Sequence, residues 1–229
     1  MDTLIRSIKF PISFDVERLQ SDLSRIMNKN WVDHYNKNDY TGKWTSVALM
    51  SKDGKSDTIF ALSNATDEIV NTEILDSCTY FKEILEGFHF EKTAVRLLQL
   101  TAGAEIKPHS DHCLGYEDGS FRLHIPIITN PDVEFILDNN RLIMNEGECW
   151  YIDANFTHSV ANRGKQDRIH LVIDGLRNEW TDVLFYKEAP ENQFMKPEIT
   201  MSEEQKLLVI AELKRMNTST ANELIKNLK

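Results

Sequence analysis

The chain has 229 residues, of which 41% are hydrophobic and 27% charged, and its formal net charge is −10. This composition is typical of a globular protein with a sizeable buried core, and it argues against a fibrous or disordered chain. The negative charge disfavours sequence-independent binding to nucleic acid or to an anionic membrane, because both favour a basic surface. It leaves room for a small anionic ligand held by one buried arginine.

The three cysteines, Cys78, Cys113 and Cys149, are odd in number and form no CxxC pair. This spacing argues against a disulfide scaffold or a zinc knuckle. The first residues lack the long apolar run of a signal peptide, and no stretch approaches transmembrane length. We therefore expect a cytoplasmic protein in a reducing setting.

The first third of the chain predicts mixed structure. Ser13 and Asp15 offer N-cap chemistry for one helical pattern, and Gly87 suits the C-cap of another. Pro11 is expected to end the first strand. In chain order, the predicted elements are a strand over 4–10, a helix over 14–27, a strand over 45–50 and a helix over 72–87.

From about residue 93 the pattern changes to short β-rich runs separated by turn signals. No helix-length pattern interrupts these runs, so a parallel α/β sheet is not expected. A barrel or a two-sheet jelly roll is the usual solution for such a series. The sequence therefore predicts a mainly β fold with flanking helices. The predicted strands cover 94–100, 121–128, 133–137, 141–144, 148–152 and 168–173.

Residues 187–201 are polar, contain two prolines and predict a connector. Helical spacing follows over 202–216 and 218–228. We expect two domains, which are a β-rich domain with N-terminal helices over 1–195 and a helical C-terminal appendage over 196–229. The apolar faces of the last two helices need a partner. That partner is either the outer wall of the β-rich domain or a second copy of the chain in a homodimer.

His109, Ser110 and Asp111 form a His-x-Asp pattern. On an extended segment, residues two apart point the same way, so His109 and Asp111 could face one metal ion while Ser110 points away. Two imidazoles and one carboxylate on one side of ferrous iron leave positions free for a co-substrate and oxygen. His158 is the best candidate for the third ligand, although His112 competes with His109. Taken alone, the short pattern is more typical of polar residues in a surface turn.

Arg168 begins an otherwise apolar strand, where an unpaired guanidinium would be costly to bury. The turn over 162–164 predicts a hairpin centred near Arg163, which would place His158 opposite Arg168 on one face of one sheet. Two interpretations stay open. Arg168 either forms a salt bridge with a neighbouring Asp or Glu, or holds the carboxylate of a ligand through two hydrogen bonds.

The segment 121–127 alternates between two faces, with Arg122 and His124 on one and Phe121 and Leu123 on the other. If the polar face lines the inside of a barrel, it would form an anion-binding pocket. If it lies outside, it is the solvent face of an antiparallel sheet, which is the favoured interpretation when the segment is considered alone.

Two stretches carry a family resemblance: RLLQLTAGAEIKPHSDHCLGYEDGSFRLHIPIITNP over 96–131 and NEGECWYIDANFTHSVANRGKQDRIHLVID over 145–174. They resemble the aspartyl/asparaginyl β-hydroxylase family, which includes bacterial proline hydroxylases. The resemblance rests on the combination of HSD, RLHIPI, GECWYID, a distal histidine and an arginine ten residues after it. The segment YTGKWTSVAL also looks similar to the bacterial members.

The resemblance implies a double-stranded β-helix, which is the cupin-like jelly roll, together with Fe(II), 2-oxoglutarate and O2. It maps the metal ligands onto His109, Asp111 and His158, and the far carboxylate of 2-oxoglutarate onto Arg168. Animal members have glycine where this chain has Asp111. The full set of two histidines and one carboxylate therefore looks intact here, which also separates the chain from iron halogenases, where chloride takes the place of the carboxylate.

The resemblance also suggests that His124 and Arg122 contact the co-substrate or the substrate. Arg122 could pair with a substrate carboxylate. Family members carry a polar co-substrate contact about where this chain has Leu98, and Gln99 is expected to replace it.

The predicted activity is hydroxylation of an unactivated C–H bond in an amino acid, free or within a peptide, with release of succinate and CO2. The family points to the β-carbon of Asp or Asn, or to a proline ring. Two other classes stay open. One is a cupin-like metalloenzyme that does not use 2-oxoglutarate and so would not need Arg168 to bind it. The other is a non-catalytic binding or sensing protein on the same scaffold, which would lack affinity for iron.

Overall fold

The computed structural model describes residues 4–60, 68–196 and 203–227. The chain forms two compact units, Met1–Met195 and Lys196–Lys229. Part of the predicted connector, residues 197–201, lies outside the described residues. So do the first residue of one predicted C-terminal helix and the last residue of the other.

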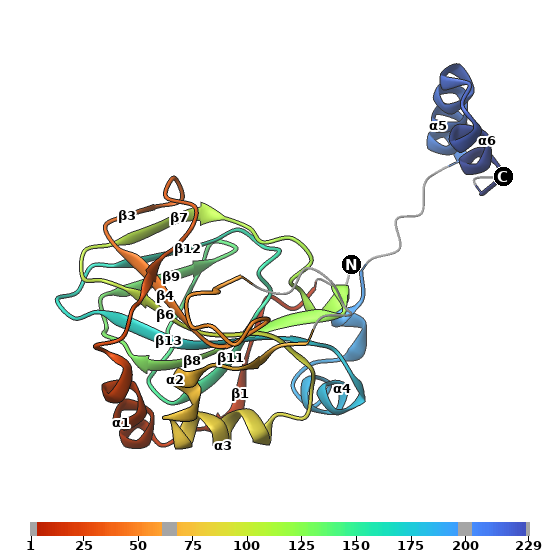
Figure 1. Ribbon diagram of the computed structural model, residues 1–229. Coiled ribbons are helices and arrows are strands. Elements are labelled where there is room, and N and C mark those ends of the chain that lie inside the picture. The colour runs from red at the N-terminus through yellow and green to blue at the C-terminus, as the bar shows by residue number, and fades with distance from the viewer. Residues whose placement is uncertain (1–3, 61–67, 197–202, 228–229) are drawn as a thin grey trace. The chain divides into compact units, whose positions relative to one another are not determined.

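Two antiparallel sheets lie face to face in the first unit (Figure 1). The large sheet contains β1 (Ser7–Ser13), β2 (Val32–Asp33), β4 (Trp44–Ser51), β5 (Val70–Asn71), β6 (Lys92–Leu100), β8 (Ser120–Ile128), β11 (Glu148–Ile152) and β13 (Arg168–Leu176). The small sheet contains β3 (Tyr40–Thr41), β7 (Glu105–His109), β9 (Val133–Leu137), β10 (Asn140–Leu142) and β12 (His158–Asn162).

The strand order is β1-β11-β8-β13-β6-β4-β2 in the large sheet, with β5 beside β4, and β10-β9-β12-β7-β3 in the small sheet. Neighbouring strands pair antiparallel throughout the described residues. The predicted mainly β jelly-roll fold with flanking helices is confirmed.

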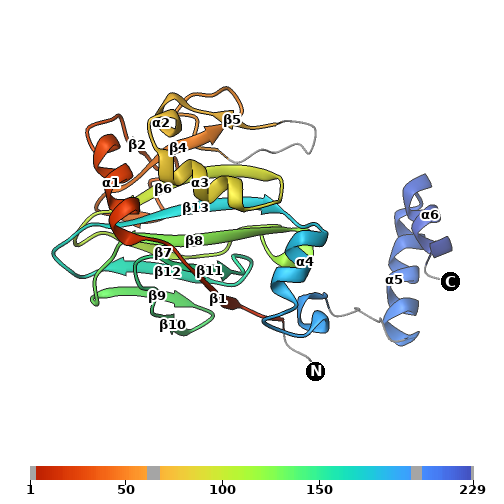
Figure 2. The ribbon, with the colours of Figure 1, turned by 90° about the horizontal axis from the view of Figure 1, so that it is seen from below.

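Helices cover the face of the large sheet that points away from the small sheet (Figures 1 and 2). They are α1 (Val16–Ile26), α2 (Glu73–Asp76), α3 (Thr79–Gly87) and α4 (Glu179–Phe185), with short 3-10 turns at Tyr116–Asp118 and Glu191–Phe194. Leu19 of α1 and Phe81 of α3 join Leu97 and Leu171 of the sheet in the main hydrophobic core. This core fixes the large sheet from behind.

The opposite face of the large sheet turns toward the small sheet and is rich in polar side chains. Successive strand residues point to opposite faces, so Ile169 and Leu171 enter the core while Arg168 and His170 face the space between the sheets. The same alternation places six charged or imidazole side chains of β6, β8 and β13 on this inner face: Arg96, Arg122, His124, Arg168, His170 and Asp174. The space between the sheets is therefore the natural place for a site.

The first strand runs through Pro11 instead of ending before it. β1 is the edge strand of the large sheet, and an edge strand tolerates proline because one of its sides makes no ladder hydrogen bonds. Its register with β11 shifts between Phe10 and Ser13, where the pairing is irregular.

The predicted helix over 72–87 is in fact two helices, α2 and α3. Buried Asp22 of α1 explains the break. Its Oδ2 accepts hydrogen bonds from the backbone N–H groups of Tyr80 (2.7 Å) and Phe81 (3.0 Å). These first-turn donors of α3 have no partner within the helix, so Asp22 supplies the cap from another element.

The predicted hairpin between His158 and Arg168 is wrong. β12 lies in the small sheet between β9 and β7, whereas β13 lies in the large sheet between β8 and β6. Asn162 stabilises the connection that takes the chain from the small sheet to the large sheet, because its Nδ2 donates to the backbone oxygens of Leu100 (3.1 Å) and Gln166 (2.9 Å). His158 and Arg168 nevertheless line one cavity, which they reach from different sheets.

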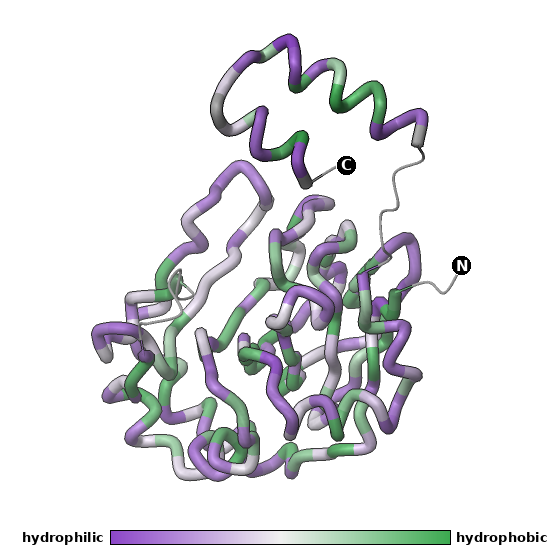
Figure 3. Tube along the Cα trace, turned by 90° about the vertical axis from the view of Figure 1, so that its right-hand side faces the viewer, coloured by the Kyte–Doolittle hydropathy of each residue, from purple (hydrophilic) through white to green (hydrophobic). Residues whose placement is uncertain are grey.

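The second unit contains the two predicted helices, α5 (Glu203–Met216) and α6 (Ser219–Asn227). Ala221 and Ile225 of α6 are buried, but Leu207 and Leu208 of α5 are each 66% exposed. Figure 3 shows this apolar stretch within α5. Among the described residues of both units, no helix is long and apolar enough to cross a membrane.

Candidate metal centre

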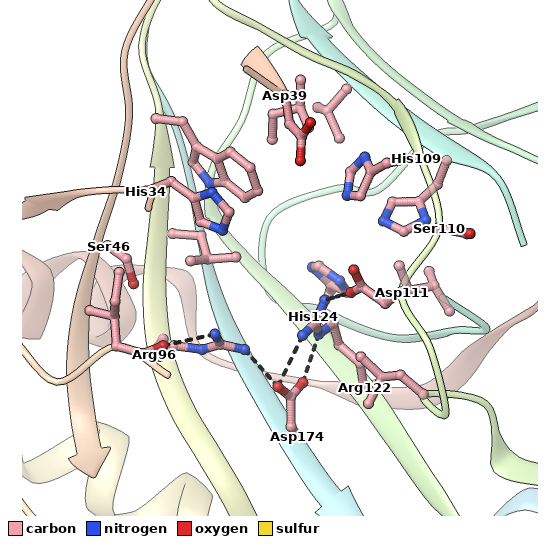
Figure 4. Close-up of a pocket in the computed structure, with 18 of the residues that line it drawn as sticks. His34, Asp39, Ser46, Arg96, His109, Ser110, Asp111, Arg122, His124 and Asp174 are labelled. Atoms are coloured by element: carbon pink, nitrogen blue, oxygen red, sulfur yellow. Dashed lines mark hydrogen bonds and ion pairs between the residues drawn. The ribbon is translucent and has the colours of Figure 1, made fainter. Parts of the chain in front are cut away.

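Three of the predicted site residues, His109, Asp111 and His158, form one cluster. Figure 4 shows His109 and Asp111 on the wall of the cavity. His109 at the end of β7 pairs directly with His158 at the start of β12, and their ring centroids are 4.3 Å apart. Asp111 follows two residues after His109. Each residue offers one ligand atom, and these three atoms lie within 4.8 Å of one another.

Both histidines of this cluster present one ring nitrogen to the protein. Nδ1 of His109 lies 2.8 Å from the backbone oxygen of Lys107, and Nδ1 of His158 lies 3.0 Å from that of Phe156. Imidazoles that donate through Nδ1 keep the lone pair of Nε2 for a metal. Burial lowers the pKa of His158 to about 4, so its ring is neutral near pH 7, as a metal ligand must be.

Asp111 is held by two other segments. Its backbone N–H donates to the oxygen of Ala154 (2.8 Å), and its Oδ2 accepts from Nη1 of Arg122 (2.7 Å). Burial alone would raise the pKa of Asp111, but the Arg122 guanidinium outweighs it and holds that pKa below its usual range. The carboxylate is therefore ionised, as a cation ligand should be.

Arg168 is almost fully buried, with 2% exposure. Its Nη2 donates to Nδ1 of His170 (2.8 Å), and its Nε has no hydrogen-bond partner among the residues that the structure describes. Burial lowers the pKa of Arg168 to about 9. Within residues 4–60, 68–196 and 203–227, no Asp or Glu forms an ion pair with it, so the salt-bridge alternative is wrong there. An uncompensated buried guanidinium is suited to a ligand carboxylate.

His124 is 4% exposed, and neither ring nitrogen has a hydrogen-bond partner in the described part of the chain. Burial lowers the pKa of His124 well below its usual value, so the ring is neutral. A neutral imidazole can donate one hydrogen bond and accept another. Its ring centroid lies 5.6 Å from that of His170, which accepts the hydrogen bond from Arg168, so His124 lies near Arg168 on the cavity wall.

The expectation for Gln99 is wrong. Gln99 lies on the opposite face of β6 from Leu98, which lines the cavity. Its Nε2 donates to Oδ2 of Asp167 (2.7 Å), and its Oε1 accepts from the hydroxyl of Thr45 (3.1 Å). Adjacent strand residues point to opposite faces, so Gln99 cannot replace a contact at the position of Leu98.

Arg122 does line the cavity, but its guanidinium is already engaged (Figure 4). Besides the bond to Asp111, its Nε donates to Oδ1 of Asp174 (2.7 Å) and its Nη2 to Oδ2 of Asp174 (3.0 Å). Nη2 of Arg96 also donates to Oδ2 of Asp174 (2.6 Å). Sequence reasoning missed Arg96 and Asp174, although Asp174 alternates in phase with Arg168 on β13.

The cavity that these residues line has a volume of about 700 Å³. Several buried polar atoms on its wall have no hydrogen-bond partner within residues 4–60, 68–196 and 203–227, which is unusual in a protein interior. They are Nδ1 of His34, Nε1 of Trp44, Oγ of Ser46, Nε of Arg96, both ring nitrogens of His124 and Nε of Arg168. Such a wall is built to contact polar ligands.

A solved structure shares this architecture. It is an oxidoreductase of the 2OG-Fe(II) oxygenase family from Burkholderia pseudomallei, 14% identical, with a TM-score of 0.51 over 75% of this chain and 86% of that one. At this identity the likeness shows a common fold.

The sequence profile described as aspartyl/asparaginyl beta-hydroxylase matches residues 13–178. L-proline cis-4-hydroxylase of Rhizobium meliloti (strain 1021) is 31% identical over 167 residues, or 71% of this chain and 58% of that protein. L-proline cis-3-hydroxylase 1 of a Streptomyces species is 26% identical over 167 residues, or 71% of this chain and 57% of that protein. The chain spans little more than half the length of these relatives. It belongs to the aspartyl/asparaginyl β-hydroxylase family, which confirms the resemblance.

Proposed function

We propose that this chain is an Fe(II)- and 2-oxoglutarate-dependent hydroxylase of an amino acid, free or within a peptide. One observation carries the proposal. A cluster of two histidines and an aspartate shares a cavity with Arg168, a buried guanidinium that has no counterion among the described residues. The first supplies ligands for a metal, and the second supplies the charge that a dicarboxylate co-substrate needs.

The donor set fits ferrous iron. Two neutral imidazoles and one carboxylate on one side of a cavity are the pattern that non-haem Fe(II) oxygenases use. In the proposed site, His109, Asp111 and His158 hold the metal. When bound, iron and 2-oxoglutarate together supply the oxidation, in which one atom of O2 goes to succinate, formed with loss of CO2, and the other enters a substrate C–H bond.

The remaining roles fall to the protein's own side chains. Arg168 binds the far carboxylate of 2-oxoglutarate, which replaces the missing counterion. His170 orients the guanidinium through its hydrogen bond to Nη2. His124, neutral and without a partner, offers the co-substrate one further hydrogen bond. Burial of all three groups keeps water away from the reacting centre.

The substrate is an amino acid in this proposal, since the two relatives are named as hydroxylases of L-proline. Arg96 and Arg122 line one wall of the cavity, where a substrate carboxylate would meet their N–H groups, although Asp174 and Asp111 balance their charges. The catalytic parts all belong to the unit over 1–195, so residues 196–229 are proposed as an appendage to the oxygenase domain.

The first test is an anaerobic titration of the Fe(II)-loaded protein with 2-oxoglutarate, followed by the visible charge-transfer absorption of the chelate. We expect a saturable band that is absent in His109→Ala. Arg168→Ala should weaken 2-oxoglutarate binding at least about tenfold, since hydrogen bonds to a charged group contribute about 1.5–3 kcal/mol.

Arg163→Ala is the matched control, because Arg163 is 58% exposed and pairs with Glu134 at the surface. It should leave the titration unchanged. If iron binds and no band forms, the chain is instead a metalloenzyme on the same barrel that does not use 2-oxoglutarate. If iron does not bind, a non-catalytic binding protein becomes the better description.

A further inference from the structure

Asp174 connects two arginines that line the cavity and belongs to neither the proposed metal ligands nor the proposed co-substrate pocket. It lies on β13 directly opposite Arg122 on β8 and opposite Ala94 on β6. Asp174 is 1% exposed. Its Oδ1 accepts one hydrogen bond, from Arg122, and its Oδ2 accepts two, from Arg122 and Arg96. A buried carboxylate with three charge-assisted bonds is rigidly fixed.

The hydrogen bonds from Arg122 to Asp174 determine how the Arg122 guanidinium is oriented toward Asp111. The Nε and Nη2 edge of the guanidinium is turned to Asp174, at 2.7 Å and 3.0 Å, so only Nη1 reaches Asp111. Arg122 therefore takes one carboxylate oxygen of Asp111 and leaves the other. A guanidinium free to turn would offer Asp111 a bidentate pair, the arrangement that Arg and carboxylate groups favour.

We propose that Asp174 is a positioning residue that acts through Arg122 to keep one oxygen of Asp111 available to the metal. The inference rests on the proposed metal site at His109, Asp111 and His158. Its consequence is that metal affinity depends on a residue that touches no metal ligand. Groups that orient ligands from outside typically change metal affinity by about 10- to 100-fold when they are removed.

Arg96 completes the electrostatics of this arrangement. Two arginines, Arg96 and Arg122, face two carboxylates, Asp174 and Asp111, so the four buried or half-buried charges balance before a metal binds. Loss of Asp174 alone would leave Arg122 to neutralise Asp111 in competition with the metal. The metal affinity of the folded protein would then fall by more than a general loss of folding stability could explain.

The test uses Co(II), whose visible absorption reports the number and geometry of its ligands, and the 229-residue apoprotein without co-substrate. In Asp174→Asn we expect a dissociation constant for Co(II) about 10- to 100-fold higher than in the unmodified chain, together with an altered visible spectrum. The double variant Arg96→Gln/Asp174→Asn removes one positive and one negative charge together. It should weaken Co(II) binding similarly and provides a folded variant if the single substitution does not fold.

Asp22→Asn is the matched control, because Asp22 is also a buried carboxylate with several hydrogen bonds but lies in α1. It should lose stability and keep the Co(II) affinity and spectrum. Folded Asp174 variants with unchanged Co(II) affinity and spectrum would overturn the inference while leaving the metal site intact. An unmodified chain that binds no Co(II) would instead sink the proposed function itself.

Discussion

Among single residues outside the metal cluster, Asp153 is a buried carboxyl group whose charged form is strongly disfavoured. It is fully buried, its Oδ1 accepts from the backbone N–H of Asn155 (3.0 Å), and the Glu117 carboxyl group lies beside it. Burial, and then the nearby Glu117 carboxylate, raise the pKa of Asp153 to about 7. Ala154, the next residue, accepts the hydrogen bond from the backbone of Asp111, so this charge sits behind the proposed metal ligand.

The raised pKa gives stability a definite pH dependence. Between pH 3.8 and about 7, Asp153 keeps its proton in the folded protein and loses it in the unfolded chain. The folded state then binds more protons, so this group's contribution to stability falls as the pH rises through that window. The full contribution of Asp153 to the free energy of unfolding is present at pH values below its pKa in the unfolded chain.

Asp153→Asn keeps the shape and the acceptor while it removes the ionisation. We expect the variant to match the unmodified chain at pH 4 and to exceed its free energy of unfolding by at least about 1 kcal/mol at pH 8. Urea denaturation at both pH values measures this difference. Asp57→Asn, an exposed control, should show none. An equal effect of Asp153→Asn at the two pH values would contradict the assignment.

Among the helices and strands, the N-terminal cap of α3 could not be predicted, because a residue of another helix supplies it. The apolar spacing over 72–87 continues through the break, because α2 and α3 bury their side chains against the same sheet face. The break depends on Asp22, which is distant in sequence and accepts two N–H groups of α3. Local patterns cannot reveal a cap supplied by another helix.

Asp22→Ala should lower the free energy of unfolding by about 2 kcal/mol, since it removes a buried charged acceptor and a helix cap together. Asp15→Ala removes the exposed cap of α1, whose side chain accepts from the N–H of Arg18, and should cost only about 1 kcal/mol. Thermal or chemical unfolding compares the two. A loss in Asp22→Ala no larger than that in Asp15→Ala would show that the buried cap adds nothing.

The sequence predicted which residues of each strand point to the same face of the sheet, and therefore most of the side chains on the inner face. Alternation put Arg122 with His124, and the structure keeps them on one wall of the cavity. The same rule should have excluded Gln99, because Leu98 beside it faces the cavity. Asp174 was not identified from the sequence, since its importance comes from Arg122, its partner on the neighbouring strand β8.

At the scale of the whole molecule, sequence indicated a two-sheet fold but not which strand joins which sheet. The turn after Asn162 has ordinary hairpin chemistry, yet it carries the chain from the small sheet to the large one. Sheet membership depends on packing between distant segments, such as β6 against β13, that no local pattern encodes. The wrong hairpin still placed His158 and Arg168 near one another, because both arrangements bring these residues toward one cavity.

The C-terminal helices present a prediction at this scale. Leu207 and Leu208 are exposed on α5, and the expectation that these helices mediate a homodimer depends on such apolar surface. Leu207→Asp/Leu208→Asp in the full chain should abolish concentration-dependent association in sedimentation velocity and leave Co(II) binding unchanged. Leu224→Asp on α6 provides a comparison at a single exposed position. A chain that stays monomeric without any substitution would contradict the dimer.

The two-faced strands of the large sheet also bear on how this protein can change over generations. In β13, every second residue builds the helix-side core, and the residues between them carry the polar groups of the cavity. A substitution at one of the inward positions can alter ligand preference without disturbing packing on the other side. An insertion or deletion of one residue within the strand would turn the core residues toward the cavity and the cavity residues toward the core, so that both the packing and the site would be lost. New specificities in this scaffold should therefore arise by replacement within strands, with length changes confined to the loops.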